Sequence, residues 1–320
     1  MIERTGRACG KVILLGEHAV VYGIPAIAVG IDRGASAVAR ASLEGRSRLD
    51  VRAWNVSVHA GDPERDLARA FAAVLEASGA AGQGPIVVDA SADLPPGAGL
   101  GCSAALGVAV ARAVDPDAGA PQVLERAMAW ERVFHGNPSG VDAAVAAMGG
   151  PVLFTKNVGV EALGTRGTIS LAIGHSGSAS STRSMVESVA RQLERRPEVV
   201  NRTFEAIRAL VANARLALEA HDLTSLGKLM DMNQMLLSGL MLSTPEIEQL
   251  CRVAREAGGL GAKLTGAGGG GCVVALASGQ AHAERIVDGW KAANFEGFVT
   301  RVGTPDRAAS VFADRSLVTP

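Results

Sequence analysis

A proline- and glycine-rich stretch at residues 95–105, PPGAGLGCSAA, has the composition of a loop that binds phosphate. Proline cannot continue a helix or donate to a strand ladder, and the three glycines allow unusual backbone angles and the close approach of another group. From Ser103 onward the sequence is apolar and rich in alanine, which predicts a helix. A flexible loop that feeds a helix N-terminus presents free backbone N–H groups, so this stretch predicts a site for a nucleoside triphosphate.

Two better-known phosphate motifs do not fit this chain. A P-loop ends in Gly-Lys-Ser/Thr, whereas the two Gly-Lys pairs here are followed by Val12 and Leu229. Residues 266–271 have the glycine spacing of a dinucleotide fingerprint, but a strand-like apolar run follows them where that motif needs a helix. A single glycine loop is explained equally well as a structural turn. Three such loops in one chain favour a phosphate site.

A lysine, a carboxylate and an imidazole accompany an apolar strand near the start of the chain. Lys11 lies within this apolar segment, and Glu17 and His18 follow it at the turn. A second turn-rich segment, HGNPSGVD at residues 135–142, ends in the carboxylate of Asp142. Burying a lysine is costly unless it is paired with an anion. The sequence therefore suggests Asp142 as the partner of Lys11.

Each of these residues also has an ordinary explanation when it is taken alone. Lys11 could keep its ammonium group at the surface while its stem lies on apolar neighbours. Asp142 could cap the N-terminus of the helix that follows it. Glu131 could be a carboxylate on a helix surface. The types and positions of these residues leave those alternatives open.

The elements predicted around the motifs divide the chain into a strand-rich first half and a helix-rich second half. We expect an α+β fold with two domains, residues 1–165 and 166–320. We predict a turn at 32–34 and a loop at 263–265. The predicted strands are 8–15, 25–29, 35–41, 49–59, 85–90, 152–154, 169–173, 272–277 and 298–302, and the predicted helices are 65–77, 103–113, 121–134, 182–195, 199–220, 223–235, 245–256 and 281–294.

Composition excludes several broad classes of protein. The 31 Lys and Arg residues balance 32 Asp and Glu residues, which argues against a general nucleic-acid binder. No apolar run reaches the roughly 20 residues of a membrane span, and the first residues lack the apolar core of a signal peptide. The four cysteines show no Cys-x-x-Cys spacing, so we expect neither disulfides nor a zinc site. These features predict a cytoplasmic protein without nucleic-acid or membrane partners.

Four segments in order resemble the motifs of the GHMP kinases, the family of galactokinase and of homoserine, mevalonate and phosphomevalonate kinases. They are residues 10–23, 95–105, 135–142 and 263–272, and the segment 181–183, Ser-Thr-Arg, is similar as well. The residues resemble the mevalonate kinase branch most, in a compact prokaryotic form. The resemblance implies an N-terminal domain like domain 2 of ribosomal protein S5, with a left-handed βαβ crossover, and a C-terminal ferredoxin-like domain.

The resemblance implies a nucleotide site in the proline- and glycine-rich loop. The loop backbone would bind the phosphates of ATP, and residues 266–271 would support it. Ser103 and Glu131 would hold Mg²⁺, a hard cation that takes few protein oxygens beside phosphate and water. The loop residues concerned are Pro96, Gly97, Ala98, Gly99, Leu100, Gly101, Cys102 and Ser103.

The resemblance also implies the catalytic and substrate-binding residues. Asp142 would accept the proton of the terminal hydroxyl of mevalonate, or orient that hydroxyl toward the γ-phosphate. Lys11 would pair with Asp142 and stabilise the charge of the transferred phosphoryl group. The residues expected on the substrate side are Glu17, His18, Ser139 and Thr182.

The expected function is ATP-dependent phosphorylation of mevalonate to 5-phosphomevalonate, a step of isoprenoid biosynthesis. One alternative is a GHMP kinase that acts on phosphomevalonate or another small alcohol. Phosphomevalonate would call for extra cations, for which Arg183 is the one candidate. A second alternative is a non-catalytic ligand sensor on the same fold, but Lys11, Ser103, Glu131 and Asp142 are all present. The sequence leaves the oligomeric state open, with a homodimer as one option.

Overall fold

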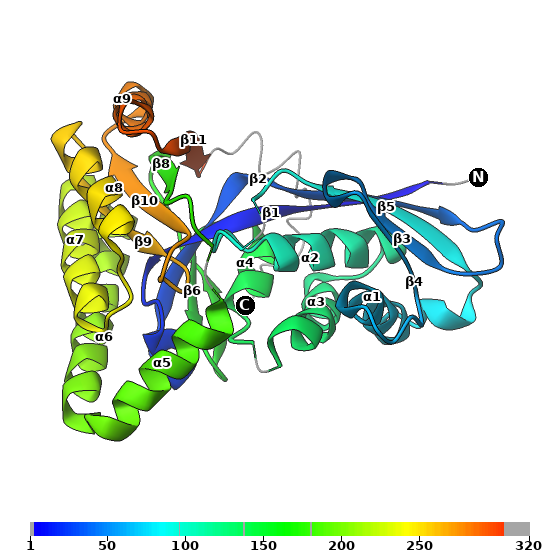
Figure 1. Cartoon of the computed structure of the whole chain (residues 1–320). Coiled ribbons are helices and arrows are strands. Elements are labelled where there is room, and N and C mark those ends of the chain that lie inside the picture. The colour runs from blue at the N-terminus through cyan, green and yellow to red at the C-terminus, as the bar shows by residue number, and fades with distance from the viewer. Residues whose placement is uncertain (1–2, 96, 137, 180, 304–320) are drawn as a thin grey trace.

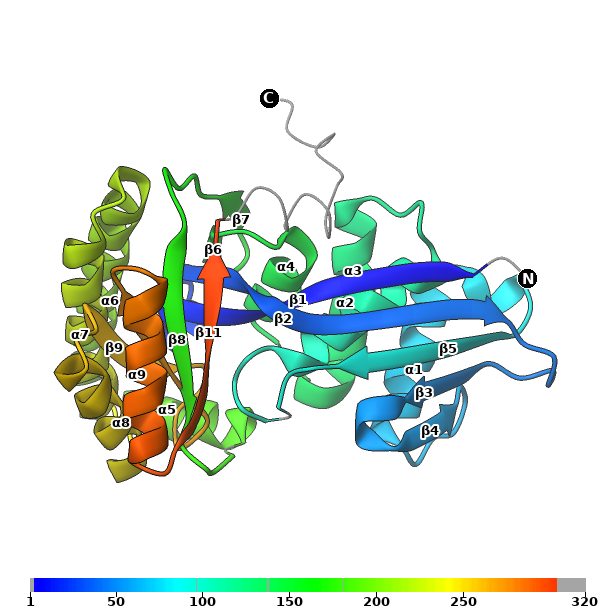
Figure 2. The same cartoon turned by 90° about the horizontal axis from the view of Figure 1, so that it is seen from above.

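Two β-sheets form the framework of the protein. The structure is a computed structural model that describes residues 3–95, 97–136, 138–179 and 181–303. In this part of the chain a seven-stranded sheet has the order β4-β3-β5-β2-β6-β7, with β1 also paired to β2, and a four-stranded sheet has the order β11-β8-β10-β9. The strands of the small sheet run across the direction of β1 and β2 (Figure 2).

The large sheet carries four helices on one face (Figure 1). Strands β3 and β5 are parallel, and β4 and α1 lie between them in the chain. The strands of this sheet are β1 (Arg4–Leu15), β2 (Ala26–Ala41), β3 (Arg48–Val51), β4 (Val56–His59), β5 (Ile86–Ala92), β6 (Val152–Thr155) and β7 (Gly159–Ala162). The helices are α1 (Asp66–Ala77), α2 (Cys102–Val114), α3 (Ala120–His135) and α4 (Val141–Met148).

The small sheet has the connectivity of a ferredoxin-like domain. Its strands follow one another in space in the order last, first, third, second, with helices between the first two strands and before the last. The strands are β8 (Ile169–His175), β9 (Gly261–Thr265), β10 (Cys272–Ala277) and β11 (Glu296–Val302). The helices are α5 (Thr182–Arg195), α6 (Pro197–Ala220), α7 (Leu223–Gly239), α8 (Pro245–Glu256) and α9 (Gln280–Ala292).

Small residues allow α2 to lie deep in the first domain. Nearly every residue of this helix is buried, and alanine, glycine and valine make up most of it. A Cβ atom on Gly6 of β1 would lie 2.0 Å from the carbonyl oxygen of Ala109, and one on Gly107 would lie 2.8 Å from the Trp130 ring. Glycine at these two positions lets β1 and α3 approach the helix closely. The N-terminus of α2, which follows the glycine loop, is thereby fixed in place.

The structure corrects three of the predicted elements and adds one strand. The predicted turn at 32–34 is wrong, because β2 continues through it while β1 pairs alongside. The predicted strand 49–59 is two strands, separated by a 3-10 turn at Arg52–Trp54 and by Asn55 with φ 50°. The predicted loop 263–265 is part of β9, and β7 was not predicted.

The junction between the two halves is tied by hydrogen bonds. The backbone N–H of Ile13 in β1 donates to Thr265 Oγ1 in β9 at 2.8 Å. The Thr300 hydroxyl of β11 donates to Asp32 Oδ1 of β2 at 2.6 Å and accepts from the Asp32 N–H at 3.1 Å. We keep as a proposal the division into residues 1–165 and 166–320, which falls in the connection between β7 and β8.

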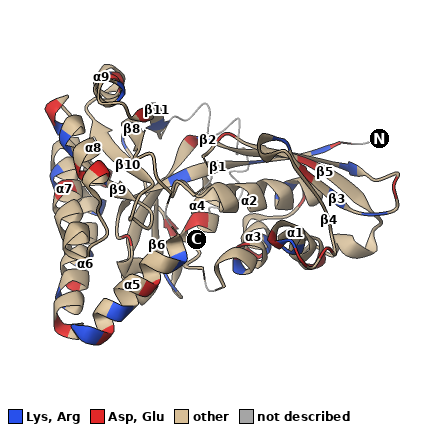
Figure 3. Cartoon of the chain, viewed as in Figure 1, with Lys and Arg blue, Asp and Glu red and all other residues tan. Residues whose placement is uncertain are grey.

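Charges of both signs are interspersed over the helices and strands (Figure 3). This pattern agrees with the formal net charge of −1. Within the described ranges, none of the helices has the length and apolar character needed to cross a membrane.

Candidate active site

The glycine loop before α2 adopts backbone angles that favour glycine. Gly97, Gly99 and Gly101 have φ values of 70°, 79° and 71°. The loop backbone lies directly over β1, because the N–H of Lys11 donates to the carbonyl of Leu100 at 2.9 Å. Side chains of the loop face inward, and Ala98, Leu100 and Cys102 are buried. The loop therefore offers its backbone to a ligand. Pro96, the first of the predicted loop residues, lies outside the described residues.

A second glycine loop, residues 266–271, supports the first by direct contact. A Cβ atom on Gly99 would lie 3.0 Å from the Thr265 carbonyl oxygen, and one on Gly271 would lie 3.1 Å from the Ala98 carbonyl oxygen. The two backbones meet with no room for side chains at these points. The contact brings the C-terminal half against the predicted phosphate loop.

A hydroxyl and a carboxylate meet at the first turn of α2. The Ser103 hydroxyl donates to Glu131 Oε1 at 2.6 Å and accepts from the Trp130 indole N–H at 3.2 Å. Glu131 is only 4% exposed. Burial, its largest influence, raises the pKa of this carboxyl to about 7, and the nearby charge of Asp142 acts in the same direction.

These oxygens fit a magnesium ion that is shared with phosphates. Mg²⁺ is held through one or two carboxylates, with phosphate and water oxygens as its remaining ligands. Among the described residues no group of three or more His, Cys, Asp or Glu side chains could hold a metal. A cation bound between Ser103 and Glu131 would need oxygens from a ligand. It would also offset the desolvated charge of Glu131.

Lys11 and Asp142 form an ion pair beneath the glycine loop. The distance from Lys11 Nζ to Asp142 Oδ1 is 3.0 Å, and Nζ also donates to the Gly99 carbonyl at 3.0 Å. Lys11 is 3% exposed, which rules out the surface-lysine alternative. Asp142 lies in the first turn of α4, whose N-cap is Gly140, so the N-cap alternative for Asp142 is wrong. The Asp142 carboxylate thus lies both at the N-terminus of α4 and beside the Lys11 ammonium group.

A pocket of about 130 Å³ opens beside this ion pair, between the two halves of the chain. Residues from β1, α3, α4, α5 and the 266–271 loop contribute to its wall. Many of the residues predicted from the sequence line it: Lys11, Glu17, His18, Glu131, Ser139, Asp142 and Thr182. The structure thus brings the predicted catalytic and substrate residues to one place.

His18 lines this pocket and has one unpaired, buried ring nitrogen. Its Nε2 lies 2.8 Å from the Ala267 carbonyl oxygen, an acceptor, so Nε2 carries the proton and Nδ1 is an acceptor. Nδ1 is buried and has no hydrogen-bond partner in the part of the chain that the structure describes. Burial lowers the pKa of His18, which favours the neutral ring.

Glu17 lies at the pocket wall, but its carboxylate faces the C-terminal half. Oε1 is ion-paired with Lys263 of β9, and Oε2 accepts from the Asn233 side-chain amide of α7 at 3.1 Å. Both charged side chains of the pair are fully buried. Burial raises the pKa of Glu17 and lowers that of Lys263, while their mutual attraction opposes both shifts.

Sequence reasoning missed Lys263, Asn233 and His135. Lys263 stands inside an apolar run, the same signal that points to Lys11, but the predicted loop at 263–265 is in fact strand β9. Asn233 offered no signal on its amphipathic helix. His135 lines the pocket, with Nε2 at 3.6 Å from Glu131 Oε2, and burial lowers its pKa.

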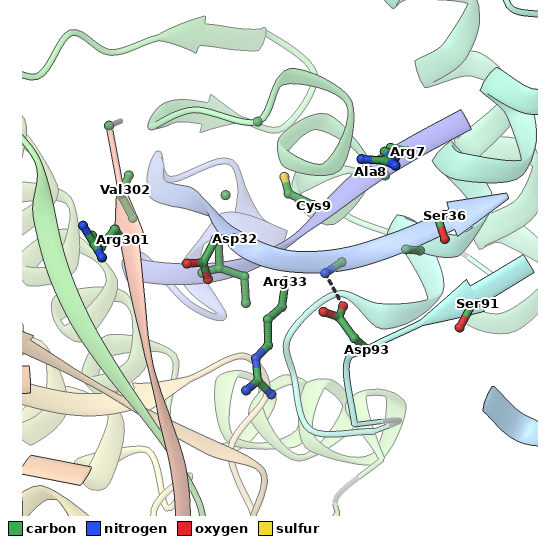
Figure 4. Close-up of a pocket in the computed structure, with 16 residues that line it drawn as sticks. Arg7, Ala8, Cys9, Asp32, Arg33, Ser36, Ser91, Asp93, Arg301 and Val302 are labelled. Carbon is green, nitrogen blue, oxygen red and sulfur yellow. Dashed lines mark hydrogen bonds between the residues drawn. The ribbon is translucent and has the colours of Figure 1, made fainter. Parts of the chain in front are cut away.

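A larger cavity of about 390 Å³ lies elsewhere, where β2 passes β11. None of the predicted site residues lines it. Figure 4 shows Arg7 and Arg301 on opposite sides of this cavity, so the two cations do not converge on one ligand. Asp93 is held by the N–H of Gly34 at 2.5 Å. The smaller pocket is the candidate active site, because it joins the ion pair, the carboxylate and the phosphate loop.

Comparisons with known proteins agree with this geometry. The family model for the N-terminal domain of GHMP kinases matches residues 66–150, and the model for the C-terminal domain matches residues 214–296. The mevalonate kinase of Thermococcus sibiricus is 36% identical over 294 residues, covering 84% of this chain and 88% of the relative. That of Pyrococcus horikoshii is 35% identical over 297 residues, covering 85% of this chain and 88% of the relative.

Solved structures show the same architecture over nearly the full length. The structure of L. major mevalonate kinase in complex with R-mevalonate has a TM-score of 0.80 at 28% identity, covering 95% of this chain and 97% of that one. The Lactococcus lactis galactokinase complexed with galactose shares the fold, with a TM-score of 0.77 at 17% identity, covering 94% of each chain. With both family models in order and this identity to curated relatives, the chain belongs to the GHMP kinase family.

Proposed function

We propose that the chain is an ATP-dependent kinase that phosphorylates mevalonate to 5-phosphomevalonate, a step of isoprenoid biosynthesis. The observation that carries this proposal is the ion pair of buried Lys11 with partly exposed Asp142, which lies between the phosphate loop and the pocket. The mevalonate kinases that are 36% and 35% identical to this chain support mevalonate as the acceptor.

In this proposal Asp142 and Lys11 act on the acceptor hydroxyl and on the phosphoryl group. Asp142 accepts the hydroxyl proton or orients the hydroxyl toward the γ-phosphate. Lys11 pairs with Asp142 and stabilises the negative charge of the transferred group. The close pairing of the two side chains, with Lys11 also held by Gly99, fixes both at the start of the reaction.

The loop 96–103 binds the triphosphate of ATP through its backbone N–H groups and the N-terminus of α2. Ser103 and Glu131 would hold Mg²⁺, which when bound offsets the phosphate charge. The Ser103–Glu131 hydrogen bond keeps both oxygens on one side of the loop.

The substrate side of the pocket is formed by His18, Ser139 and Thr182. The free Nδ1 of His18 can accept a hydrogen bond from a substrate hydroxyl. Thr182 begins α5, whose N-terminus favours a negative group such as the carboxylate of mevalonate. Glu17 is placed to act through its neighbours, since both of its oxygens are already bonded.

The pocket favours mevalonate over phosphomevalonate. The phosphate group of phosphomevalonate would call for extra cations. Arg183, the candidate from the sequence, is not among the described residues that line the pocket, although its charge acts on His135, which lines it. The sensor alternative is disfavoured because Lys11, Ser103, Glu131 and Asp142 are present and form contacts suited to catalysis.

A coupled assay of ADP release tests the proposal with mevalonate, phosphomevalonate, galactose and homoserine, each with ATP and Mg²⁺. We expect mevalonate to give the highest kcat/KM. A clear preference for another of these alcohols would overturn the substrate, and no ADP release with any of them would favour a ligand sensor.

We also propose that the enzyme acts in the cytoplasm. Cys9, Cys102, Cys251 and Cys272 are all free thiols and buried, which suits a reducing compartment. A homodimer, the option that the sequence left open, is tested by light scattering of the purified protein.

A further inference from the structure

We infer that Lys263 and Asn233 are positioning residues, which act through Glu17 to hold the turn that presents His18 to the substrate. The inference rests on the proposed function, because it assigns a role within the same pocket. It gives Glu17 a different task from the direct substrate contact expected from the sequence.

The turn that carries His18 is strained. His18 has φ 60° and ψ −50°, and the N–H of Ala19 donates to the Glu17 carbonyl at 2.7 Å. These angles and this bond define a γ-turn of the positive-φ form, which is rare for residues other than glycine. Strained residues of this kind persist only where the surrounding structure determines their conformation, and they cluster at functional sites. Something around His18 must therefore hold the turn.

Glu17 is the residue through which the turn is held. It directly precedes His18, and its carbonyl closes the γ-turn while its side chain is fixed on the other side. Lys263 bonds one carboxylate oxygen and Asn233 bonds the other. The carboxylate has a partner on each oxygen, so it cannot rotate without breaking a bond to β9 or α7.

All three donor protons of the Lys263 ammonium group have acceptors in this neighbourhood. An ammonium group has three protons. Lys263 directs them to Glu17 Oε1, to the Ile13 carbonyl at 3.4 Å and to the Leu264 carbonyl. Its partners lie in β1, in the turn after β1 and in β9. One fully buried cation thus joins the strand that leads into the turn with the sheet of the other half.

The far side of the turn is fixed by the same neighbourhood. His18 Nε2 donates to the carbonyl of Ala267, two residues after the end of β9. The turn is therefore held at two points. The Glu17 side chain is bonded to Lys263 and Asn233, and the His18 ring is bonded to the Ala267 carbonyl. Nδ1 is the ring nitrogen left without a hydrogen-bond partner among the described residues, and we propose that it is the atom that accepts a bond from the substrate.

A role in geometry explains why a charged pair is buried here. Taking two charges out of water costs about as much as their attraction returns, so a buried pair is weak evidence for stability. Hydrogen bonds with fixed directions can instead hold one conformation. Loss of the anchor should let the turn relax and move the imidazole within the pocket. Misplacement by about 1 Å far from the chemistry can cost up to about 100-fold in rate.

Steady-state kinetics with three variants test the inference. Lys263→Met leaves an unpaired buried carboxylate, so the double variant Glu17→Gln/Lys263→Met, which removes both charges, is made as the more foldable form. Asn233→Ala removes one bond and leaves the ion pair. We expect the KM for mevalonate to rise about tenfold or more in the first two, and less in Asn233→Ala. The KM for ATP should change less than about twofold.

A matched control separates positioning from simple loss of stability. Val74→Ala removes buried volume in α1, which contributes no residue to the pocket. A variant that only destabilises should lower the melting temperature and leave both KM values unchanged. If Lys263→Met and the double variant behave like Val74→Ala, the positioning role is wrong.

A double-mutant cycle adds a second criterion. In the Lys263→Met background, His18→Gln should raise the KM for mevalonate much less than it does in the wild type, because the ring is already misplaced. If the two effects multiply, the residues act independently and the inference is overturned.

NMR of the substrate-free protein makes the test independent of the proposed function. In protein labelled with ¹⁵N-histidine, the Nε2–H of His18, bonded to Ala267, should give a slowly exchanging signal that is assigned with His18→Gln. The signal should disappear in the Glu17→Gln/Lys263→Met variant and persist in Val74→Ala. Persistence in both variants would refute the anchor, whatever alcohol the enzyme phosphorylates.

Discussion

At the scale of single residues, the site combines three buried charges with different surroundings. Lys11 has a carboxylate and a carbonyl as partners, Glu131 has a hydroxyl, and Glu17 has an ammonium group. The type of partner decides what each residue can do. Asp142, which is partly exposed, is the carboxylate that a substrate hydroxyl can reach.

The Asp142–Lys11 pair gives the first prediction. Asp142→Asn keeps the size of the side chain but removes the charge that accepts or orients the proton, so kcat should fall by about 100-fold or more. Lys11→Met should also lower kcat strongly, and the double variant should lose much less than the product of the two losses. Initial rates and melting temperatures are measured on the same preparations. A stable Asp142→Asn enzyme with nearly normal kcat would exclude the catalytic role.

The proposed cation site gives the second prediction. Ser103→Ala and Glu131→Gln should each raise the Mg²⁺ concentration needed for half-maximal rate, because each removes one oxygen ligand. Titration of initial rates with Mg²⁺ measures this shift, and circular dichroism checks the fold. Ser57→Ala, at an exposed position in β4, serves as the control. Unchanged Mg²⁺ dependence in both site variants would remove the metal role.

The buried imidazole gives a third prediction, for stability against pH. Burial lowers the pKa of His18 in the folded state below its ordinary value of 6.5. The folded protein therefore binds this proton less tightly than the unfolded chain, so stability present above 6.5 is lost as the pH falls toward the folded pKa. The contribution of His18 to the free energy of unfolding in urea should therefore fall from about pH 7.5 to about pH 5.5. The raised pKa of Glu131 acts in the opposite direction over this range, so the test compares the slope of each variant with that of the wild type. His18→Gln should reduce this slope, and the exposed His59→Gln should not. Equal slopes in all three proteins would contradict the assignment.

At the scale of elements, sequence periodicity predicts the long helices well. The bounds of α5 and α8 agree with the prediction, because their apolar faces and their N-caps Ser181 and Thr244 are local features. The strands are predicted less well. Whether residues 32–34 turn or continue depends on pairing with β1, which is distant in sequence, and no local pattern reports it.

The close contact between the glycine loop and β1 gives a fourth prediction. Gly101→Ala places a Cβ 2.9 Å from Lys11 Cγ, at a φ of 71° that strains any residue with a side chain. Gly45 is a matched control, with φ 70° and nothing within 4 Å of the added Cβ. Both alanine variants should lose about 1 kcal/mol or more of stability, but only Gly101→Ala should lose kcat. Equal kcat in the two variants would mean that the close contact with Lys11 is unimportant.

At the scale of the whole molecule, the motifs predicted that the site residues lie close together. They did not predict the contacts between the N-terminal and C-terminal halves of the chain. Lys11, His18 and Asp142 carry local signals, since a lysine in an apolar strand and a carboxylate after a turn are visible in the sequence. The pairing of Glu17 with Lys263, or of Asp32 with Thr300, depends on contacts between residues that are far apart in the chain. Such contacts follow from the assembled fold.

The junction of β2 with β11 gives the fifth prediction. Thr300 is 1% exposed and makes two hydrogen bonds to Asp32. Thr300→Val keeps the shape but removes both hydrogen bonds to Asp32, each worth about 0.5–1.5 kcal/mol, so the free energy of unfolding should fall by about 1–3 kcal/mol. Chemical denaturation measures the change. Thr203→Val in α6, whose hydroxyl makes a solvent-exposed bond to the Val199 carbonyl of its own helix, should change it by less than about 0.5 kcal/mol. A similar small change in Thr300→Val would show that the junction contributes little.

The anchor formed by Glu17 and Lys263 also sets when the pocket can form during synthesis. The two residues are 246 positions apart. A ribosome that adds about 5–20 residues per second needs roughly 10–50 s to cover that distance. During that interval the growing chain already contains the strand and turn before His18, but it lacks the ammonium group that fixes them. The Glu17 carboxylate of the first half therefore stays hydrated until β9 has been synthesised. The complete pocket forms only late in translation.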